Sequence, residues 1–288
     1  MAPLWLAYEQ GLFREQGLDV ELVFLSSVRT DQGVLTGDTP IGYGTNVVAM
    51  RLSGGDLVAI AGVANVLSYT LFAQPGLATP QDLRGKTMVV TQPGASNTLA
   101  ALITLRHFGL EPHRDVALQP TQGSTEQLAI LQQGLADAGL FSPPADAKAL
   151  ELGLVPLADL KALNIPFFLT GIGTTESYSR SHSEVVRRFL RGYVVGVGAA
   201  RKNAEAAKAV IAKYTQTDDP AIVDASYRYY RDLWARPDFR VPPAAIASVL
   251  RVLDVPGAAT AKPEDFIDNR FVDELHESGF IRQVAPFD

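Results

Sequence analysis

The sequence of 288 residues contains no cysteine, and this absence excludes several kinds of chemistry. A chain without cysteine has no disulfide, no thiolate metal ligand and no thiol nucleophile. Its four histidines are scattered, and none follows an expected strand end. Because a catalytic triad or a metal site needs such groups close together, we predict no metal, no cofactor and no catalytic residue.

Long apolar runs and basic runs are also missing. A transmembrane helix needs roughly 18 consecutive apolar residues, and no stretch reaches this length. The balance of 25 Lys and Arg against 31 Asp and Glu gives a net charge of −6, which does not favour nucleic acid or an anionic membrane as a partner. With 47% hydrophobic residues and no long biased segment, the chain is expected to be globular.

The sequence shows no export signal, because Met1 leads through Pro3 directly into an apolar helical pattern. Pro3 suits the first turn of a helix, and Gly17 ends the pattern. An α/β chain that starts on a helix is expected to have lost an upstream segment, and any export signal with it.

Strand-like runs alternate with helical patterns over the first part of the chain, and the rest is helical. This alternation predicts mostly parallel sheets flanked by helices, with a helical C-terminal tail packed onto a sheet already built. The expected strands are 19–25, 41–43, 57–63, 69–73, 87–91, 116–118, 138–141 and 167–170. The expected tail helices are 181–202, 204–214, 219–234, 243–253 and 264–278.

Two stretches rich in Gly, Pro and Thr, at 74–80 and 170–177, indicate where the chain crosses between lobes. We therefore predict an α/β protein of two lobes with hinges at these crossings. Residues 1–76 and 176–288 form lobe 1, and residues 77–175 form lobe 2, which is inserted in lobe 1.

The stretch Thr91–Thr98 organises this architecture, because an apolar run stops at Pro93-Gly94 and restarts as a helix with Ser96. The first amides of a helix have no intrahelical partners and lie at the positive end of its dipole. A carboxylate, sulfonate or phosphate is therefore bound there without a basic side chain. The alternative is that Ser96 or Asn97 only caps its own helix.

Turns of the same small, neutral, hydrogen-bonding kind follow several expected strands. In parallel α/β sheets, ligands bind outside the carboxyl ends of the strands, so turns from two lobes can face a common cleft. Of these turns, 123–125 is the one most expected to be only a helix cap. The turns are Ser26-Ser27, Gly44-Thr45-Asn46, Gly94-Ala95-Ser96-Asn97, Gly123-Ser124-Thr125 and Ser142-Pro143-Pro144.

Arg29 and Tyr69, which lie near these turns, are each open to two interpretations. Arg29 in a first helical turn is unfavourable against the dipole, so it either binds an anionic ligand or pairs with Asp31 at the surface, and the surface pair is preferred. Ser68 comes directly before the expected strand 69–73, and Tyr69 begins it; Tyr69 either stacks on a ligand or is an ordinary strand aromatic.

Enzyme motifs are incomplete. A nucleophile elbow of the form G-x-S-x-G requires glycine where Thr98 stands, and a dinucleotide turn requires glycine where Glu176 stands. No phosphate-binding G-x-x-x-x-G-K-[ST] motif is present. We do not predict an enzyme.

Four blocks of the sequence, taken together and in this order, resemble a known protein family. They are Ala2–Phe13 with Gln16–Glu21; Gly37-Asp38 with Ile41-Gly42; Asp82–Lys86 with Pro93-Gly94; and Leu128, Leu131 and Gly134 leading to Asp137-Ala138. Together they resemble the nitrate/sulfonate/taurine-type periplasmic binding proteins of ABC importers, a superfamily that also includes thiamine-pyrimidine-precursor binders.

This resemblance implies a type II periplasmic binding protein: a monomer with two lobes that closes around one small molecule and passes it to a permease. The family has a strand before its first helix, and that strand is absent here, so lobe 1 is expected to lack its first strand. The resemblance places the ligand site at Ser26, Ser27, Thr45, Asn46, Gly94, Ala95, Ser96, Asn97 and Ser142; Arg29, Ser68 and Tyr69 are added from the reasoning above.

The expected function is that of an extracytoplasmic, periplasmic solute-binding protein for a small organic anion such as a sulfonate, a nitrate-like ion or an aromatic acid. One alternative is an enzyme on the same scaffold, of the thiamine-pyrimidine or menaquinone-pathway type. The pyrimidine synthases carry a cysteine-rich iron motif, and this chain has no cysteine. The other alternative is a sensory ligand-binding module.

Overall fold

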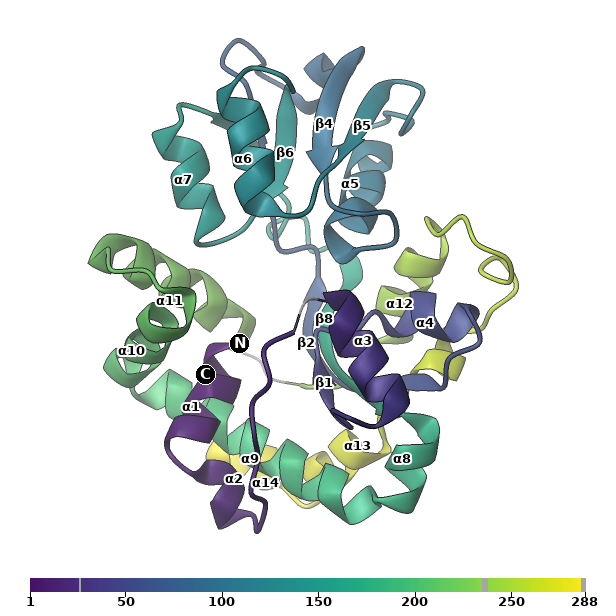
Figure 1. Ribbon diagram of the computed structural model, residues 1–288, viewed down its shortest axis with the longest axis vertical. Coiled ribbons are helices and arrows are strands. Elements are labelled where there is room, and N and C mark those ends of the chain that lie inside the picture. The colour runs from purple at the N-terminus through teal and green to yellow at the C-terminus, as the bar shows by residue number, and fades with distance from the viewer. Residues whose placement is uncertain (26, 235–237, 286–288) are drawn as a thin grey trace. The chain divides into compact units, whose positions relative to one another are not determined.

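A computed structural model describes residues 1–25, 27–234 and 238–285 (Figure 1). The chain divides into two compact units. Unit 1 comprises Met1–Val63, Thr170–Pro243 and Lys262–Asp288, and unit 2 comprises Ala64–Leu169 and Ala244–Ala261.

The division confirms an insertion of one α/β unit into another but moves its boundaries. The chain leaves unit 1 inside strand β2 (Leu57–Val66) and returns inside β8 (Pro166–Thr175). The first crossing therefore comes before 74–80, because the apolar run continues as one long strand beyond Val63. Residues 244–261 join unit 2, whereas the sequence assigned the whole tail to lobe 1. The hinge role of the crossings stays a prediction.

Unit 1 contains a small sheet of order β1-β8-β2 and most of the helices described. Strand β1 (Gly42–Tyr43) is antiparallel to β8, with Gly42 opposite Gly173 and Tyr43 opposite Ile172. The helices are α1 (Ala2–Glu9), α2 (Leu12–Glu15), α3 (Ser27–Thr36), α4 (Val47–Leu52), α8 (Glu176–Ser181), α9 (Ser183–Lys202), α10 (Ala204–Thr215), α11 (Pro220–Trp234), η2 (Pro263–Phe266), α13 (Arg270–Glu277) and α14 (Phe280–Val284).

Unit 2 contains a sheet of order β5-β4-β6-β3-β7. Strand β4 is parallel to β5 and β6, whereas β3 is antiparallel to β6 and β7. The strands are β3 (Thr70–Ala73), β4 (Lys86–Val90), β5 (Val116–Pro120), β6 (Ala138–Phe141) and β7 (Val155–Asp159); the helices are η1 (Pro80–Leu83), α5 (Ser96–His107), α6 (Ser124–Gln132), α7 (Ala145–Glu151) and α12 (Pro243–Leu250).

Most predicted elements are confirmed within a few residues, including the long tail helices. Strand β7 was not predicted; it carries Pro156 and lies at the edge of the sheet, where proline is tolerated and the strand signal is weak. Within the described ranges, no helix is both long and apolar enough to cross a bilayer.

The prediction of a strand at 19–25 is wrong. These residues are described, but none of them belongs to a strand. Val23 and Phe24 are 54% and 59% exposed, although both are large and apolar. The alternating sequence pattern indicates a chain that can form a strand, but a strand also needs a hydrogen-bonding neighbour.

Helix α9 forms the centre of the unit 1 core, and α1 packs directly on it (Figure 1). The contact is close because α9 presents glycine at the crossing. A Cβ atom added to Gly196 would lie 2.4 Å from the carbonyl oxygen of Pro3 and 2.8 Å from the Cβ of Ala7. At Gly192, an added Cβ would lie 2.5 Å from the ring of Phe13.

We expect Gly196→Ala to destabilise the protein. In an isolated helix this substitution is favourable by about 1 kcal/mol, but here the methyl group meets backbone, so overpacking of about 1–3 kcal/mol outweighs the propensity gain. Urea unfolding measures the difference, and Lys202→Ala on the exposed end of α9 is the control, which is expected to change little. A stability gain in Gly196→Ala would show that α1 and α9 are not in close contact.

Candidate functional site

One edge of the unit 2 sheet brings the predicted turns together. Because β4, β5 and β6 are parallel, their carboxyl ends lie at the same edge. Strand β3 runs in the opposite direction, and its first residue, Thr70, pairs with Phe141 at the end of β6. The preceding residues Ser68 and Tyr69 therefore reach the edge from which the Gly94 and Ser142 turns also start. The sequence could not show this, because strand direction is not visible in it.

Helix α5 begins at this edge with Ser96, and Ala95 is the N-cap residue. Gly94 has a φ of 81°, which glycine adopts without strain. No side chain caps the helix, and the first described intrahelical bond runs from the Leu99 amide to the Ala95 carbonyl. The structure therefore differs from the alternative in which Ser96 or Asn97 caps its own helix. The first-turn amides stay available to an anion.

Asn97 has a different role from its neighbour Ser96. Its Oδ1 accepts from the Thr91 amide at 3.3 Å and from Gln127 Nε2 at 3.4 Å, while its Nδ2 donates to the Leu140 carbonyl at 3.1 Å. One side chain thus joins the ends of β4 and β6 to α6. Ser96 is half-buried, and among the described contacts its hydroxyl makes no hydrogen bond.

The two remaining predicted turns of unit 2, at Ser142 and at 123–125, also differ from each other. Ser142 is half-buried at the end of β6, and its carbonyl accepts from the amides of Ala145 and Asp146 at 2.9 and 3.3 Å. At the 123–125 turn, the Glu126 carboxylate accepts from the Gln122 amide at 2.7 Å, a local bond typical of a helix start. This arrangement favours the structural interpretation of 123–125.

Unit 1 presents its predicted residues on α3 and after β1. Ser26 lies outside the described residues; Ser27 begins α3, and its side chain is not described. Arg29 is exposed on α3, but Asp31 is not its surface partner. Asp31 is only 1% exposed and accepts from the Asn46 amide at 2.9 Å and from Asn46 Nδ2 at 2.8 Å. Residues two apart on a helix point in different directions, which explains the separation.

The turn Thr45-Asn46 is held tightly from both sides. Asp31 fixes Asn46, and burial raises the pKa of the Asp31 carboxyl group, opposed by the hydrogen bonds from Asn46. Thr45 is 5% exposed, and its buried hydroxyl has no partner among the described residues. A Cβ atom on Gly173 would lie 2.3 Å from that hydroxyl oxygen. Only glycine therefore fits at this position of β8 beside Thr45.

The sequence reasoning considered Asp31 only as a partner for Arg29 and did not identify Gln127. Both are polar residues almost without exposure, at 1% each. A polar residue on the apolar face of a predicted helix is the signal that points to such bracing groups, because a buried polar side chain requires a hydrogen-bond partner.

We expect Asp31→Asn to lower the free energy of unfolding at pH 7 by about 1–3 kcal/mol, because one of the two acceptors for Asn46 becomes a donor. The raised pKa of Asp31 means that the native carboxyl group takes up its proton at a higher pH than an unfolded one. Because the native state then binds a proton that the unfolded state does not, the deficit of Asp31→Asn relative to the parent protein should grow as the pH falls through that raised value.

Urea unfolding at pH 7 and near pH 4 measures both effects. Asp19→Asn is the matched control, since Asp19 is 85% exposed in its side chain and pairs with Arg14 at the surface. A deficit in Asp31→Asn that stays constant or shrinks as the pH falls would contradict a raised pKa of Asp31 in the native state.

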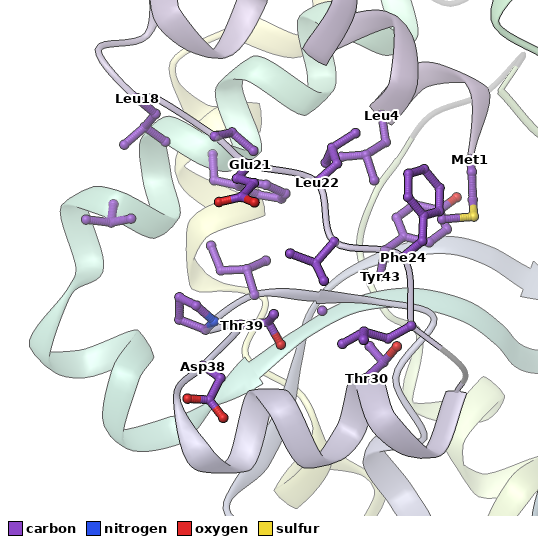
Figure 2. A pocket seen from close by; sticks show the side chains of 18 of the residues that line it. Met1, Leu4, Leu18, Glu21, Leu22, Phe24, Thr30, Asp38, Thr39 and Tyr43 are labelled. Carbon is purple, nitrogen blue, oxygen red and sulfur yellow. The ribbon is translucent and has the colours of Figure 1, made fainter. Parts of the chain in front are cut away.

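Unit 1 also contains a cavity of about 530 Å³ (Figure 2). Among the predicted site residues whose side chains are described, none lines this cavity. One wall is the segment Leu18–Leu25 and the other is Asp38–Tyr43, with helical residues between them. Within the described residues, no group of three or more His, Asp or Glu side chains could hold a metal ion.

Solved structures that are similar across nearly the whole chain include periplasmic binding proteins. The alkanesulfonate-binding protein SsuA of Xanthomonas axonopodis pv. citri, bound to MOPS, matches with a TM-score of 0.71 and 16% identity, over 95% of this chain and 93% of that one. The aliphatic sulphonate-binding protein SsuA of Escherichia coli matches with a TM-score of 0.68 and 20% identity, over 99% and 86%. The chain therefore has the periplasmic binding protein fold.

The family assignment is more specific. Residues 1–207 match the NMT1/THI5-like family, and the chain belongs to this family. No curated protein sequence matches the chain. The same fold also occurs in an enzyme: a cysteine-to-serine variant of DszB, in complex with biphenyl-2-sulfinic acid, matches with a TM-score of 0.67 and 16% identity, over 96% of each chain. DszB is described as a desulfurization enzyme.

Proposed function

We propose that the protein is an extracytoplasmic solute-binding protein that captures a small organic anion and delivers it to an ABC importer. The observation that carries the proposal is the carboxyl edge of the unit 2 sheet. There the uncapped start of α5 presents backbone donors, and the Ser96 hydroxyl is half-buried without a described hydrogen bond. The sulfonate-binding proteins that share the fold support an anionic ligand.

The chemistry follows from the α5 amides. A sulfonate or carboxylate accepts hydrogen bonds from first-turn amides and interacts favourably with the positive end of the helix dipole. Ser96 and Ser142 add hydroxyl donors, and Tyr69 contacts the organic part of the ligand. In this proposal, the chain segments in β2 and β8 act as hinges.

An enzyme is the second candidate because DszB has the same fold. The DszB variant bound to its sulfinic acid carries serine in place of a cysteine. The present sequence has no cysteine to supply a thiol nucleophile, which favours binding over catalysis. Incubation with biphenyl-2-sulfinate distinguishes the two: release of sulfite would support an enzyme.

We expect a saturable thermal shift with one class of small anions. Methanesulfonate, taurine, MOPS, nitrate and benzoate are the probes, each compared with a chloride blank at equal ionic strength. A ligand at 100 times its dissociation constant adds about 2.7 kcal/mol of stability, which raises Tm by several degrees. No shift with any probe would overturn the proposed ligand class and leave the fold assignment intact.

The two neighbouring residues at the start of α5 should respond differently. Ser96→Ala should weaken binding of the positive probe about five- to tenfold without lowering Tm, because it removes one hydrogen bond to the ligand. Asn97→Ala should lower Tm even without ligand, because it releases the ends of β4 and β6. Calorimetric titration measures the affinity.

Ser124→Ala is the matched control, since Ser124 begins α6 as Ser96 begins α5 but is exposed. Equal loss of affinity in Ser124→Ala and Ser96→Ala would contradict the assignment of the ligand to the start of α5.

A further inference from the structure

The chain passes between the two units a second time in its C-terminal part. Besides the crossings in β2 and β8, it leaves unit 1 after Pro243 and returns after Ala261. This excursion carries α12 and residues 251–261. A hinge made of two strands needs only two crossings, so the second pair of connections requires a separate explanation.

The middle of the excursion is packed into the protein and is not a loose loop. Ala245, Ile246 and Val249 of α12 are at most 3% exposed. Within unit 2, the guanidinium group of Arg106 on α5 donates to the carbonyl of Arg251 at 3.4 Å. Burial and this hydrogen bond fix the excursion to unit 2, so it follows unit 2 when that unit moves.

Before the excursion, the chain is attached to β2 in unit 1. The carbonyl of Phe239 accepts from the amide of Gly62 at 2.7 Å. The side chain of Asn269 accepts from the Val241 amide at 2.9 Å and donates to the Val241 carbonyl at 3.1 Å. Asn269 is the N-cap residue of α13. Residues 239–241 are therefore held by β2 and by the start of α13.

Phe239 has an unfavourable backbone conformation at this attachment. Its φ of 59° lies in the left-handed region, which a bulky side chain rarely adopts. The side chain is 6% exposed, and its ring lies edge-on to that of Tyr193 with 6.0 Å between the centroids. Such strain persists only where the surrounding structure over-determines it. The contacts of Phe239, and not its local preference, therefore fix the path of the chain.

After the excursion, the chain attaches to the same strand. Ile267 forms a parallel bridge with Ala59, and the amide of Asp268 donates to the Ala59 carbonyl at 2.8 Å. Ala59 and Gly62 belong to the stretch of β2 that ends in unit 1 at Val63. Both ends of the excursion are thus bonded to β2 just before that strand crosses into unit 2.

The first linker of the excursion is short and contains two prolines. Pro242 and Pro243 lie between the attachment at Val241 and Ala244, the first residue of the excursion in unit 2. A fully extended chain spans at most about 3.5 Å per residue, so this linker reaches about 10 Å. Proline also restricts its own φ and the residue before it. The linker therefore has little slack.

We propose that residues 239–268 form a strap that limits how far the two units separate. Its two ends are fixed on β2 in unit 1, and its middle, α12, is fixed in unit 2. A rotation about β2 and β8 that exceeds the reach of the linkers pulls against both attachments. The strap narrows the range of ligand-free arrangements, which lowers the ordering cost of closing on a ligand. It acts whether or not the ligand is an anion.

The absence of cysteine allows the separation of the units to be measured directly. Glu205→Cys in unit 1 and Glu151→Cys in unit 2 provide two unique labelling sites, with side chains 86% and 52% exposed. Single-molecule energy transfer between two dyes gives the distribution of distances in the ligand-free full chain. The test variant has Gly-Gly inserted after Val241 and again after Ala261. The control has Gly-Gly inserted after Gly76, which is exposed in a turn of unit 2.

We expect the lengthened linkers to broaden the distance distribution and to extend it by up to about 7 Å, the span of two added residues. The insertion after Gly76 should leave the distribution of the parent protein unchanged. An unchanged distribution with the lengthened linkers would overturn the strap. Equal broadening in the control would show a general effect of added glycine and would overturn it as well.

Asn269→Ala tests the strap at the native chain length, and it decides the proposal if the lengthened chain does not fold. It removes both side-chain hydrogen bonds to Val241. Asn203→Ala is the matched control, because Asn203 caps α10 in unit 1 and accepts from the Ala206 amide at 3.0 Å, but lies outside the strap. We expect broadening only with Asn269→Ala. Equal distributions in the two variants would contradict the strap, whatever the outcome of the thermal-shift screen.

Discussion

Helix α5 begins with backbone N–H groups that its own turns cannot satisfy, and the surrounding residues of unit 2 hold those groups in place. Asn97 connects β4, β6 and α6, and the Thr98 hydroxyl donates to the carbonyls of Thr91 and Gln92 at 2.9 Å each. Because the side chains of Asn97 and Thr98 bond to other residues of the protein, they hold the conformation of the turn. A rigid turn with free donors is what an anion site requires, since no ordering is needed when the ligand arrives.

In unit 1, a buried acidic residue holds the Thr45-Asn46 turn in place. Asp31 holds the amide and the side chain of Asn46, and glycines at 42 and 173 allow β1, β8 and Thr45 to pack closely. A buried carboxylate is costly unless it is hydrogen-bonded, and both oxygens of Asp31 accept hydrogen bonds from Asn46. The two units thus place small polar turns on backbones braced by buried polar groups.

The segment 18–25 shows how a correct local pattern can fail to give the predicted element. Its alternation is that of a half-buried strand, yet Val23, Phe24 and Leu25 are exposed, and none of its residues belongs to a strand. Strand formation depends on pairing, which is a property of the sheet and not of the segment. The same reasoning explains why β7, with its proline and its position at a sheet edge, was not predicted.

The sequence by itself determined the order of most helices and strands, the insertion of one α/β unit in another, the absence of thiol chemistry and the presence of small polar turns after strands. These depend on local periodicity, turn residues and composition, which are written in neighbouring positions. Only the tertiary structure decided that β3 runs against β6 and so brings Tyr69 to the edge at which α5 begins. Only the tertiary structure showed that Asn97 bonds to the ends of β4 and β6 while the neighbouring Ser96 does not, and that Asp31 pairs with Asn46. These outcomes depend on contacts between residues far apart in the chain, and no local pattern records them.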